Sequence, residues 1–393
     1  MSNFSYYTPT HVYFGRGSQN RVGELVRAQG CKKVLIHYGG QSARRSGLLD
    51  QVEASLDAAG VAHVQLGGVV PNPHLSLVYE GIALCRREGV DFILAVGGGS
   101  VIDSAKAIGY GMCMDGDVWE LYDHKRRATG CLPLGVILTI AASGSEMSDS
   151  SVITKEEGGI KRGYNDDICR PKFAIMNPEL TMTLPDYQTA CGCTDILMHT
   201  MERYFVQGDA MEITDSIAEG LLRTVMAQAK ILRDDPQNYD ARAEVMWAGS
   251  LSHNGLTGCG HSESDFASHR LEHEMGGMFD VAHGAGLAAI WGSWARYVYQ
   301  SCLPRFVRFA RNVMGVETGL SDEDTALRGI ELMEDFFRSI HMPTCFSELG
   351  IHPTQAQLDE MAHKCYLAVG GLLGSAKKLD ESDMLAIYKM ADH

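Results

Sequence analysis

The sequence predicts two domains: an α/β N-terminal domain built on a parallel sheet, followed by an all-α C-terminal domain. The chain of 393 residues is long enough for two domains of roughly 150 to 200 residues each. Its first half alternates short apolar segments with amphipathic helical patterns, the order that produces β-α-β units with right-handed crossovers. Beyond about residue 185 the helical patterns are long and no series of strands follows. We therefore place the domains at 1–185 and 186–393.

The elements of the first half can be read in order along the chain. Each expected strand is a short apolar run, and the run at 132–143 is almost wholly apolar, as a buried parallel strand should be. Glycines close two of the helices, at Gly60 and Gly89. We expect strands within 32–40, 61–69, 90–100, 132–143 and 172–178, helices within 47–60, 74–89 and 101–112, and a hairpin at 150–166.

The second half begins with a helix start signal. Thr183 is followed three residues later by Asp186, with Pro185 between them, which is typical of a capped helix N-terminus. Apolar stripes at helical spacing continue through 214–235, 239–256 and 324–340.

Composition and charge exclude several classes of function. The chain is 45% hydrophobic and 21% charged, which is typical of a globular protein. Its net charge of −15 disfavours nucleic acid and anionic membranes as partners, since both attract clustered Lys and Arg. We find no basic-then-apolar leader and no uninterrupted apolar stretch of about 18 residues. The eleven cysteines lack a C-x-x-C pair, so we expect buried, reduced thiols and a cytoplasmic location.

Glycine and hydroxyl clusters follow the expected strands. Gly97, Gly98 and Gly99 come directly after a buried strand and Ser100 opens a helix, where a helix N-terminus can receive pyrophosphate. A second glycine turn, "HYGGQSARRSG", favours a dinucleotide over a single phosphate. Purely structural turns are the alternative. Hydroxyls also cluster after the fourth strand, at Thr139, Ser143, Ser145 and Ser148.

Two helical stretches carry the residue types of a metal site. Asp195 and His199 lie four apart, so they share one helix face, and His269 and His273 repeat that spacing. His283 follows at the start of another apolar run. Asp195, His199, His269 and His283 fit Fe²⁺ or Zn²⁺, and His273 is either a neighbouring proton-relaying group or an alternative ligand. We interpret His253 and His261 as structural.

These motifs resemble the iron-containing (group III) alcohol dehydrogenase family, and within it the butanol dehydrogenase-like branch of broad-range aldehyde reductases. The resemblance covers essentially the whole chain. It implies a dinucleotide-binding α/β domain, a helical metal-binding domain, and NAD(P)-dependent interconversion of primary alcohols and aldehydes. Its markers are "GGGSVIDSAKAI" at 97–108, "SGSEMS" at 143–148, "NPELTMTLP" at 177–185, "GCTDILMHTMERY" at 192–204 and "HRLEHEMGGMFDVAHGAGLA" at 269–288.

The resemblance also implies roles for individual residues. The family's metal positions fall on Asp195, His199, His269 and His283, and the histidine near substrate and nicotinamide falls on His273. Its cofactor contacts fall on Gly39, Gly40, Gly98, Gly99, Ser100, Asp103, Thr139, Ser143, Ser148 and Lys161. Relatives often have Thr where this chain has Ser143 and Ser148, and the hydroxyl is kept.

The first glycine turn bears on the choice of cofactor. Relatives restricted to NAD often carry an acidic residue there, whereas this chain has Gln41 and Ser42. Arg44 and Arg45 follow closely and can receive a 2′-phosphate. We therefore expect NADP(H) to be favoured over NAD(H).

The function expected is that of a metal-dependent alcohol dehydrogenase or aldehyde reductase, acting on a small molecule. Analogy with the family suggests a homodimer joined through the N-terminal strand in "TPTHVYFGRG". The alternatives are a dehydroquinate synthase-like lyase, a non-redox metal hydrolase, and a metal-loaded assembly protein without turnover.

Overall fold

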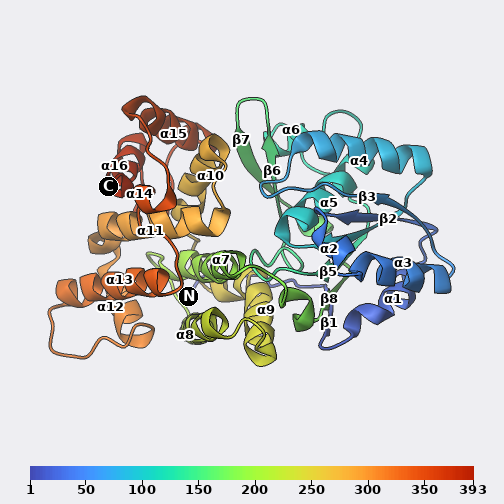
Figure 1. The fold of residues 1–393 in the computed structure, drawn as a ribbon. Helices are drawn as coiled ribbons and strands as arrows, with labels where there is room; N and C mark the ends of the chain where they lie inside the picture. Colours follow the sequence, from blue (N-terminus) through green and yellow to red (C-terminus); the bar gives the residue numbers. More distant parts are fainter. The chain divides into compact units, whose positions relative to one another are not determined.

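The computed structural model describes residues 1–393, which form two compact units (Figure 1). One unit comprises Thr8–Thr183, and the other comprises Met1–Tyr7 together with Leu184–His393. The division between them therefore falls two residues before the one we expect from the sequence. The first seven residues belong with the helical unit, which no sequence pattern indicates.

The α/β unit is built on a six-stranded sheet in which every pairing is parallel, as the sequence predicts. The strand order is β1-β8-β5-β4-β2-β3, so the first strand of the chain lies at one edge beside the last. The strands are β1 His11–Phe14, β2 Lys33–Tyr38, β3 Ala62–Leu66, β4 Phe92–Gly97, β5 Leu134–Leu138 and β8 Phe173–Met176. β6 Ser150–Lys155 and β7 Ile160–Asn165 form the expected antiparallel hairpin.

Helices cover both faces of this sheet (Figure 1). α1 Val22–Ala28 and α3 Leu48–Ala58 share one hydrophobic cluster with the apolar side chains of the strands. α4 Leu75–Glu88 and α5 Gly99–Met112 pack together on the other face. The short elements are η1 Ser18–Arg21, α2 Ser42–Arg45, α6 Trp119–Tyr122, η2 Asp167–Cys169 and η3 Pro178–Thr181.

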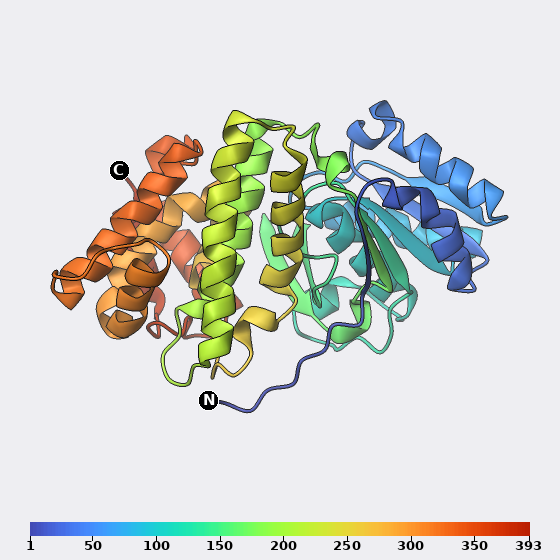
Figure 2. The ribbon, with the colours of Figure 1, turned by 90° about the horizontal axis from the view of Figure 1, so that it is seen from below.

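The second unit contains only helices and loops, as the sequence predicts. Figure 2 shows the first three long helices, α7 to α9, running side by side, and they contact one another. α11 then packs against α7, α10, α13 and α16. The helices are α7 Asp186–Tyr204, α8 Glu212–Asp234, α9 Tyr239–His253, η4 Leu256–Gly258, α10 Ala267–Phe279, α11 His283–Val298, η5 Tyr299–Cys302, α12 Leu303–Asn312, α13 Asp322–Ser339, α14 Phe346–Leu349, α15 Gln355–Ala368 and α16 Glu381–Ala391.

The first long helix starts later than the cap signal predicts. Pro185, not Thr183, is the N-cap of α7, and its backbone is extended with ψ 147°. Asp186 is consequently the first helical residue, where its carboxylate favours the positive end of the helix dipole. The predicted capping pair of Thr183 and Asp186 is therefore wrong, although the predicted helix is present.

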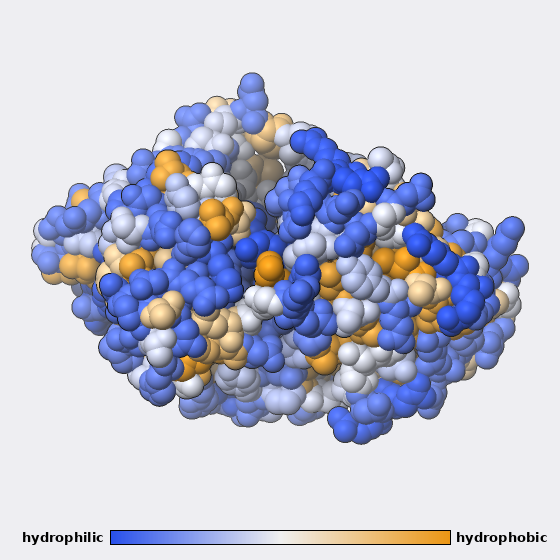
Figure 3. Space-filling view, turned by 90° about the horizontal axis from the view of Figure 1, so that it is seen from above, coloured by the Kyte–Doolittle hydropathy of each residue, from blue (hydrophilic) through white to orange (hydrophobic).

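The surface is largely hydrophilic. Hydrophilic residues cover most of the face in Figure 3, and hydrophobic ones form separate groups among them. None of the helices combines the length and the apolar character needed to cross a membrane. All eleven cysteines are free thiols.

Candidate metal centre and dinucleotide-binding turns

α7 presents Asp195 and His199 from consecutive turns of one buried face. Because the two residues are four apart in the sequence, Nδ1 of His199 lies 3.0 Å from Oδ1 of Asp195. The same nitrogen lies 3.0 Å from the backbone oxygen of Asp195. Both side chains are about 5% exposed, so water contributes little to their solvation.

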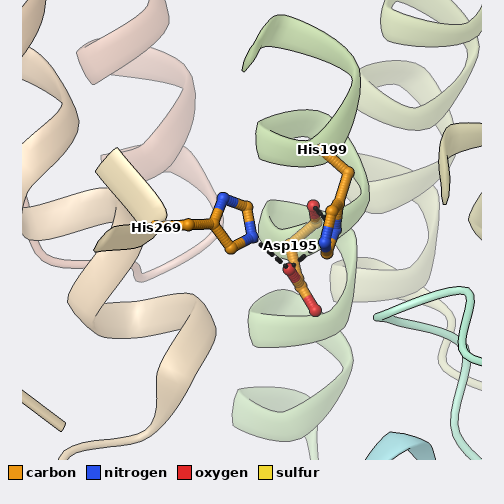
Figure 4. Close-up of side chains that lie close together, drawn as sticks. All are labelled: Asp195, His199 and His269. Atoms are coloured by element: carbon orange, nitrogen blue, oxygen red, sulfur yellow. Dashed lines mark hydrogen bonds and ion pairs between the residues drawn. The ribbon is translucent and has the colours of Figure 1, made fainter. Parts of the chain in front are cut away.

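Two further helices bring histidines to the same carboxylate oxygen. Nε2 of His269, from α10, lies 3.4 Å from Oδ1 of Asp195. Nε2 of His283, the first residue of α11, lies 3.7 Å from it. Candidate ligand atoms of Asp195, His199 and His269 all lie within 4.8 Å of one another (Figure 4). Three imidazoles from three helices therefore converge on one carboxylate.

The local backbone explains how α10 and α11 reach this position. Gly284 follows His283, and a Cβ there would lie 2.2 Å from the backbone oxygen of Cys191 on α7. Only glycine therefore lets α11 begin this close to α7. At the two ends of α10, Phe266 and Asp280 adopt the left-handed region with φ of 53° and 50°. Non-glycine residues rarely adopt this conformation unless the surrounding structure enforces it.

Burial and proximity shift the pKa values in this cluster. Burial alone would raise the pKa of Asp195, but His199, His269 and His283 outweigh it and hold that pKa well below its usual range. Burial lowers the pKa of His199 to about 4. Burial also opposes protonation of His269, but Glu202 and Asp195 outweigh it and raise the pKa of His269 to about 9. One carboxylate among these rings thus remains ionised.

Two glutamates that sequence reasoning missed contact the far side of two of the rings. Glu202 hydrogen-bonds Nδ1 of His269, and Glu272 hydrogen-bonds Nδ1 of His283. Both glutamates are buried. A spacing signal exists for Glu202, which lies seven residues after Asp195 and thus on the same helix face. Glu272 has none beyond its place between His269 and His273.

The cluster fits a divalent metal ion. Oδ1 of Asp195 and Nε2 of His269 are buried and form no well-aligned hydrogen bond. Buried polar atoms without partners are costly, and a cation among them compensates for that cost. Three imidazole nitrogens and one carboxylate oxygen are a ligand set that suits Fe²⁺ and Zn²⁺.

Two further histidines of the helical unit, His273 and His253, lie beside this cluster, and His261 lies away from it. His273 is 7% exposed on α10, and its ring centre lies 6.0 Å from that of His283. His253 packs edge-on against His199 at 4.0 Å between ring centres, and burial lowers its pKa well below the usual value. His261 lies elsewhere, within hydrogen-bond distance of the backbone oxygen of Arg203 and of Asp215.

In the α/β unit, the predicted glycine turns follow neighbouring strands. β2, β4 and β5 are adjacent and parallel, so the turns that follow them meet at one edge of the sheet. The backbone N–H of Thr139 donates to the oxygen of Gly97 at 3.1 Å. Gly98 is the N-cap of α5, and the helix begins at Gly99, one residue before Ser100. A Cβ on Gly99 would lie 2.2 Å from Oγ of Ser143, so the two loops approach closely.

Several predicted cofactor contacts also have internal partners. Asp103 accepts hydrogen bonds from the hydroxyl of Ser145 and the backbone N–H of Val152. Ser148 is 1% exposed, and both its oxygens accept from the buried Lys106. Lys161 lies on β7 and is 4% exposed. Sequence reasoning missed Lys106, which also donates to oxygens of Ser145 and Ser150.

The glycine turn after β2, at Gly39 and Gly40, is more open than the turns after β4 and β5. A Cβ on Gly40 would meet nothing within 4 Å, and Gln41 and Ser42 are exposed at the start of α2. Arg44 donates to the hydroxyl of Tyr38 and to Gln65. Arg45 is exposed on the same short helix.

Known proteins resemble this chain along its whole length. Residues 9–178 match the family described as iron-containing alcohol dehydrogenase, and residues 189–391 match the Fe-containing alcohol dehydrogenase family, C-terminal. NADH-dependent butanol dehydrogenase A of Clostridium acetobutylicum is 38% identical over 390 residues, 99% of each chain. NADPH-dependent aldehyde reductase YqhD of Escherichia coli is 34% identical, covering 89% of this chain and 90% of the other.

Solved structures agree with these matches. A crystal structure of NADH-dependent butanol dehydrogenase A from Thermotoga maritima has a TM-score of 0.96 and 36% identity, covering 100% of this chain and 99% of that one. A lyase or a hydrolase is not favoured by any of these matches. The chain belongs to the iron-containing alcohol dehydrogenase family and is an NAD(P)-dependent oxidoreductase that interconverts alcohols and aldehydes with the help of a divalent metal.

Proposed function

We propose that this enzyme reduces neutral primary aldehydes to alcohols, and runs the reverse reaction, with one metal ion held by Asp195, His199, His269 and His283. The observation that carries the proposal is the convergence of three histidine rings on the buried Oδ1 of Asp195, within 3.0 to 3.7 Å. When bound, a divalent metal supplies Lewis-acid polarisation of the substrate carbonyl. Fe²⁺ and Zn²⁺ both suit these ligands, and metal analysis of the purified protein decides between them.

The substrate class follows from the surroundings of the ligands. Met198, three residues after Asp195 and therefore on the same face of α7, is apolar and buried. Apolar surroundings favour a neutral aldehyde over the acidic, phosphorylated substrates that a Lys- and Arg-lined site would bind. The names of the relatives, butanol dehydrogenase and aldehyde reductase, support the same class.

A direct assay tests the reaction. Adding butanal to the metal-loaded enzyme and reduced nicotinamide should lower the absorbance of the reduced cofactor, because hydride leaves it. An acidic aldehyde of similar length should react less well. Lyase or hydrolase chemistry would leave that absorbance unchanged.

We propose that His273 holds and transfers the proton that accompanies hydride transfer. Its support is burial on α10 one turn after His269, with its ring 6.0 Å from that of His283. We expect His273→Ala to keep its metal and lose about 100-fold or more in kcat, the usual contribution of a general acid or base. His269→Ala should instead lose metal and activity together.

The matched control is His352→Ala, since His352 is an exposed histidine of the same unit. It should change neither metal content nor kcat. Full turnover by His273→Ala would remove His273 from the mechanism.

We propose a preference for NADPH over NADH. The support is the absence of a carboxylate from residues 39–45 and the presence of Arg45 on the exposed α2. Arg44, on the same short helix, donates to Tyr38 and Gln65. The names of the relatives include both NADH-dependent and NADPH-dependent enzymes. Comparing kcat/KM for the two reduced cofactors tests the proposal, and a strong NADH preference contradicts it.

We propose a cytoplasmic homodimer joined through the N-terminal strand. β1 lies at an edge of the sheet, paired on one side by β8 only, and Phe14 at its end is 42% exposed. An open strand edge can accept a strand from a second copy. The eleven free thiols are consistent with a reducing compartment. Light scattering that returns the mass of one 42.9 kDa chain would contradict the dimer.

A further inference from the structure

The carboxylates of Glu202 and Glu272 are buried beside the histidine cluster of the helical unit. Glu202 is 1% exposed on α7, and Glu272 is 0% exposed on α10. Buried carboxylates are expensive and are retained where hydrogen bonds or charges compensate for them. Each of these two contacts Nδ1 of a different histidine of the cluster.

The contacts fix which ring nitrogen can bind a metal. An ionised carboxylate can only accept hydrogen bonds, so Nδ1 of His269 and of His283 must carry the hydrogen. The remaining nitrogen of each ring, Nε2, then offers its lone pair. These are the nitrogens that lie 3.4 Å and 3.7 Å from Oδ1 of Asp195.

Glu202 makes two hydrogen bonds to one residue of α10. One oxygen of Glu202 accepts from the backbone N–H of His269 at 2.9 Å, and the other accepts from the ring of the same residue. Glu202 therefore fixes both the backbone of His269, in the first turn of α10, and the orientation of its ring. Glu272 is held close to α11 because Gly286 has no Cβ, which would lie 2.9 Å from its Cγ.

We propose that Glu202 and Glu272 are positioning residues that orient His269 and His283 toward the metal and strengthen both as ligands. This inference rests on the proposed function and extends it to residues outside the ligand set. Partners of this kind fix the tautomer of a ligating histidine and increase its basicity, and losing one weakens metal binding by about 10- to 100-fold.

The two glutamates should not be equally sensitive to a change to glutamine. The side chain in Glu272→Gln keeps an oxygen that can accept from Nδ1 of His283. In Glu202→Gln, one accepting oxygen and one donating amide replace the carboxylate, so the side chain cannot accept from both the backbone N–H and the ring of His269. We therefore expect Glu202→Gln to weaken metal binding more than Glu272→Gln.

The experiment measures the affinity of the metal-free full chain for Zn²⁺ by competition with a chromophoric chelator. Glu272→Gln should lose about 10-fold and Glu202→Gln about 100-fold relative to the wild type. Glu219→Gln is the matched control, because Glu219 is 5% exposed and its partners are Tyr204, Arg308 and Asn312. It should bind Zn²⁺ as the wild type does.

A second readout separates orientation of the ligands from general loss of structure. In Co²⁺-loaded protein, the visible ligand-field bands should shift in both glutamine variants and stay unchanged in Glu219→Gln. Metal-free melting temperatures show whether each variant folds. If Glu202→Gln does not fold, Glu272→Gln decides the proposal, and failure of both to fold overturns it by making the two carboxylates structural.

The outcomes are distinguishable from failure of the proposed function. A wild type that binds no metal refutes the metal site itself. A wild type that binds Zn²⁺ while both glutamine variants bind equally well, with unchanged Co²⁺ bands, overturns only the positioning role.

Discussion

At the scale of single residues, the centre depends on one carboxylate oxygen shared by three rings. Oδ1 of Asp195 lies within 3.7 Å of a nitrogen from each of His199, His269 and His283. Glu202 and Glu272 contact Nδ1 of His269 and His283, whereas Nδ1 of His199 lies near both Oδ1 and the backbone oxygen of Asp195. The rings of His269 and His283 are therefore oriented before any metal arrives.

Gly284 provides a test of how closely α11 must approach α7 for metal binding. An alanine there would place Cβ 2.2 Å from the backbone oxygen of Cys191, which cannot move independently of α7. We expect Gly284→Ala to cost about 1–3 kcal/mol of stability, as overpacking does, and to reduce Zn²⁺ affinity because His283 is displaced. Urea unfolding and chelator competition measure the two effects.

Gly220 offers a matched control on α8, where an added Cβ would meet nothing within 4 Å. Gly220→Ala should raise stability by up to about 1 kcal/mol through helix propensity and leave metal affinity unchanged. Wild-type Zn²⁺ affinity in Gly284→Ala would show that the close approach of α11 does not position His283.

Residues with regular spacing were easier to predict than residues that support them. Asp195 and His199 stand out because ligand types four apart share a helix face, and the structure brings them together with His269 and His283. Glu202 shares that helix face too, but it was missed because a glutamate within a helix is usually exposed and only the tertiary fold buries it.

At the scale of elements, buried strands and long helices were predicted well because periodicity identifies them directly. The strands β2, β4 and β5 fall inside the apolar runs expected for them. The exact ends depend on local geometry instead. Pro185 caps α7 two residues after the predicted cap, and α5 begins at Gly99, one residue before Ser100, which was expected to open it. The four-residue α2 is too short to show any period.

Lys106 connects α5 to the segment that carries the clustered hydroxyls. It is fully buried and donates to backbone oxygens of Ser145, Ser148 and Ser150 at 2.8 to 3.0 Å. We expect Lys106→Met to leave these oxygens unsatisfied, at about 1–3 kcal/mol for each that stays buried. The loop should loosen, raising KM for the nicotinamide cofactor several-fold.

The metal residues belong to the other compact unit, so Zn²⁺ affinity of Lys106→Met should remain that of the wild type. Lys172→Met, at an exposed position of the α/β unit, is the control for removing a lysine and should change neither quantity. An unchanged cofactor KM in Lys106→Met would mean that the segment holds its shape without the lysine.

At the scale of the whole molecule, the sequence predicted two domains because the pattern of its elements changes near residue 185. It could not predict that Met1–Tyr7 joins the helical unit, since those contacts connect residues far apart in the chain. The backbone N–H of Ser2, for example, donates to the oxygen of Gly260 at 3.0 Å. Long-range pairings of this kind have no local periodic signature.

Stability of the helical unit should depend on an ion network away from the metal residues. Asp215 on α8 is 1% exposed and accepts from Arg305 on α12 at 2.6 and 2.7 Å, and from His261 at 3.1 Å. Burial alone would raise the pKa of Asp215, but these partners outweigh it and hold that pKa well below its usual range. Removing one partner of a buried pair typically costs about 3–5 kcal/mol, so Asp215→Asn should lower the urea midpoint clearly at pH 7.

The pH dependence of this difference has a definite sign. A carboxylate whose pKa is lower in the folded than in the unfolded state stabilises the fold above its unfolded pKa of about 3.9, and that contribution is lost as pH falls. The gap between the wild-type and Asp215→Asn urea midpoints should therefore be full at pH 7 and shrink progressively below about pH 4. Asp234→Asn, an exposed partner of Arg233, should match the wild type throughout. A gap that stays constant down to pH 3 would mean that the charge of Asp215 contributes nothing and that only its shape matters.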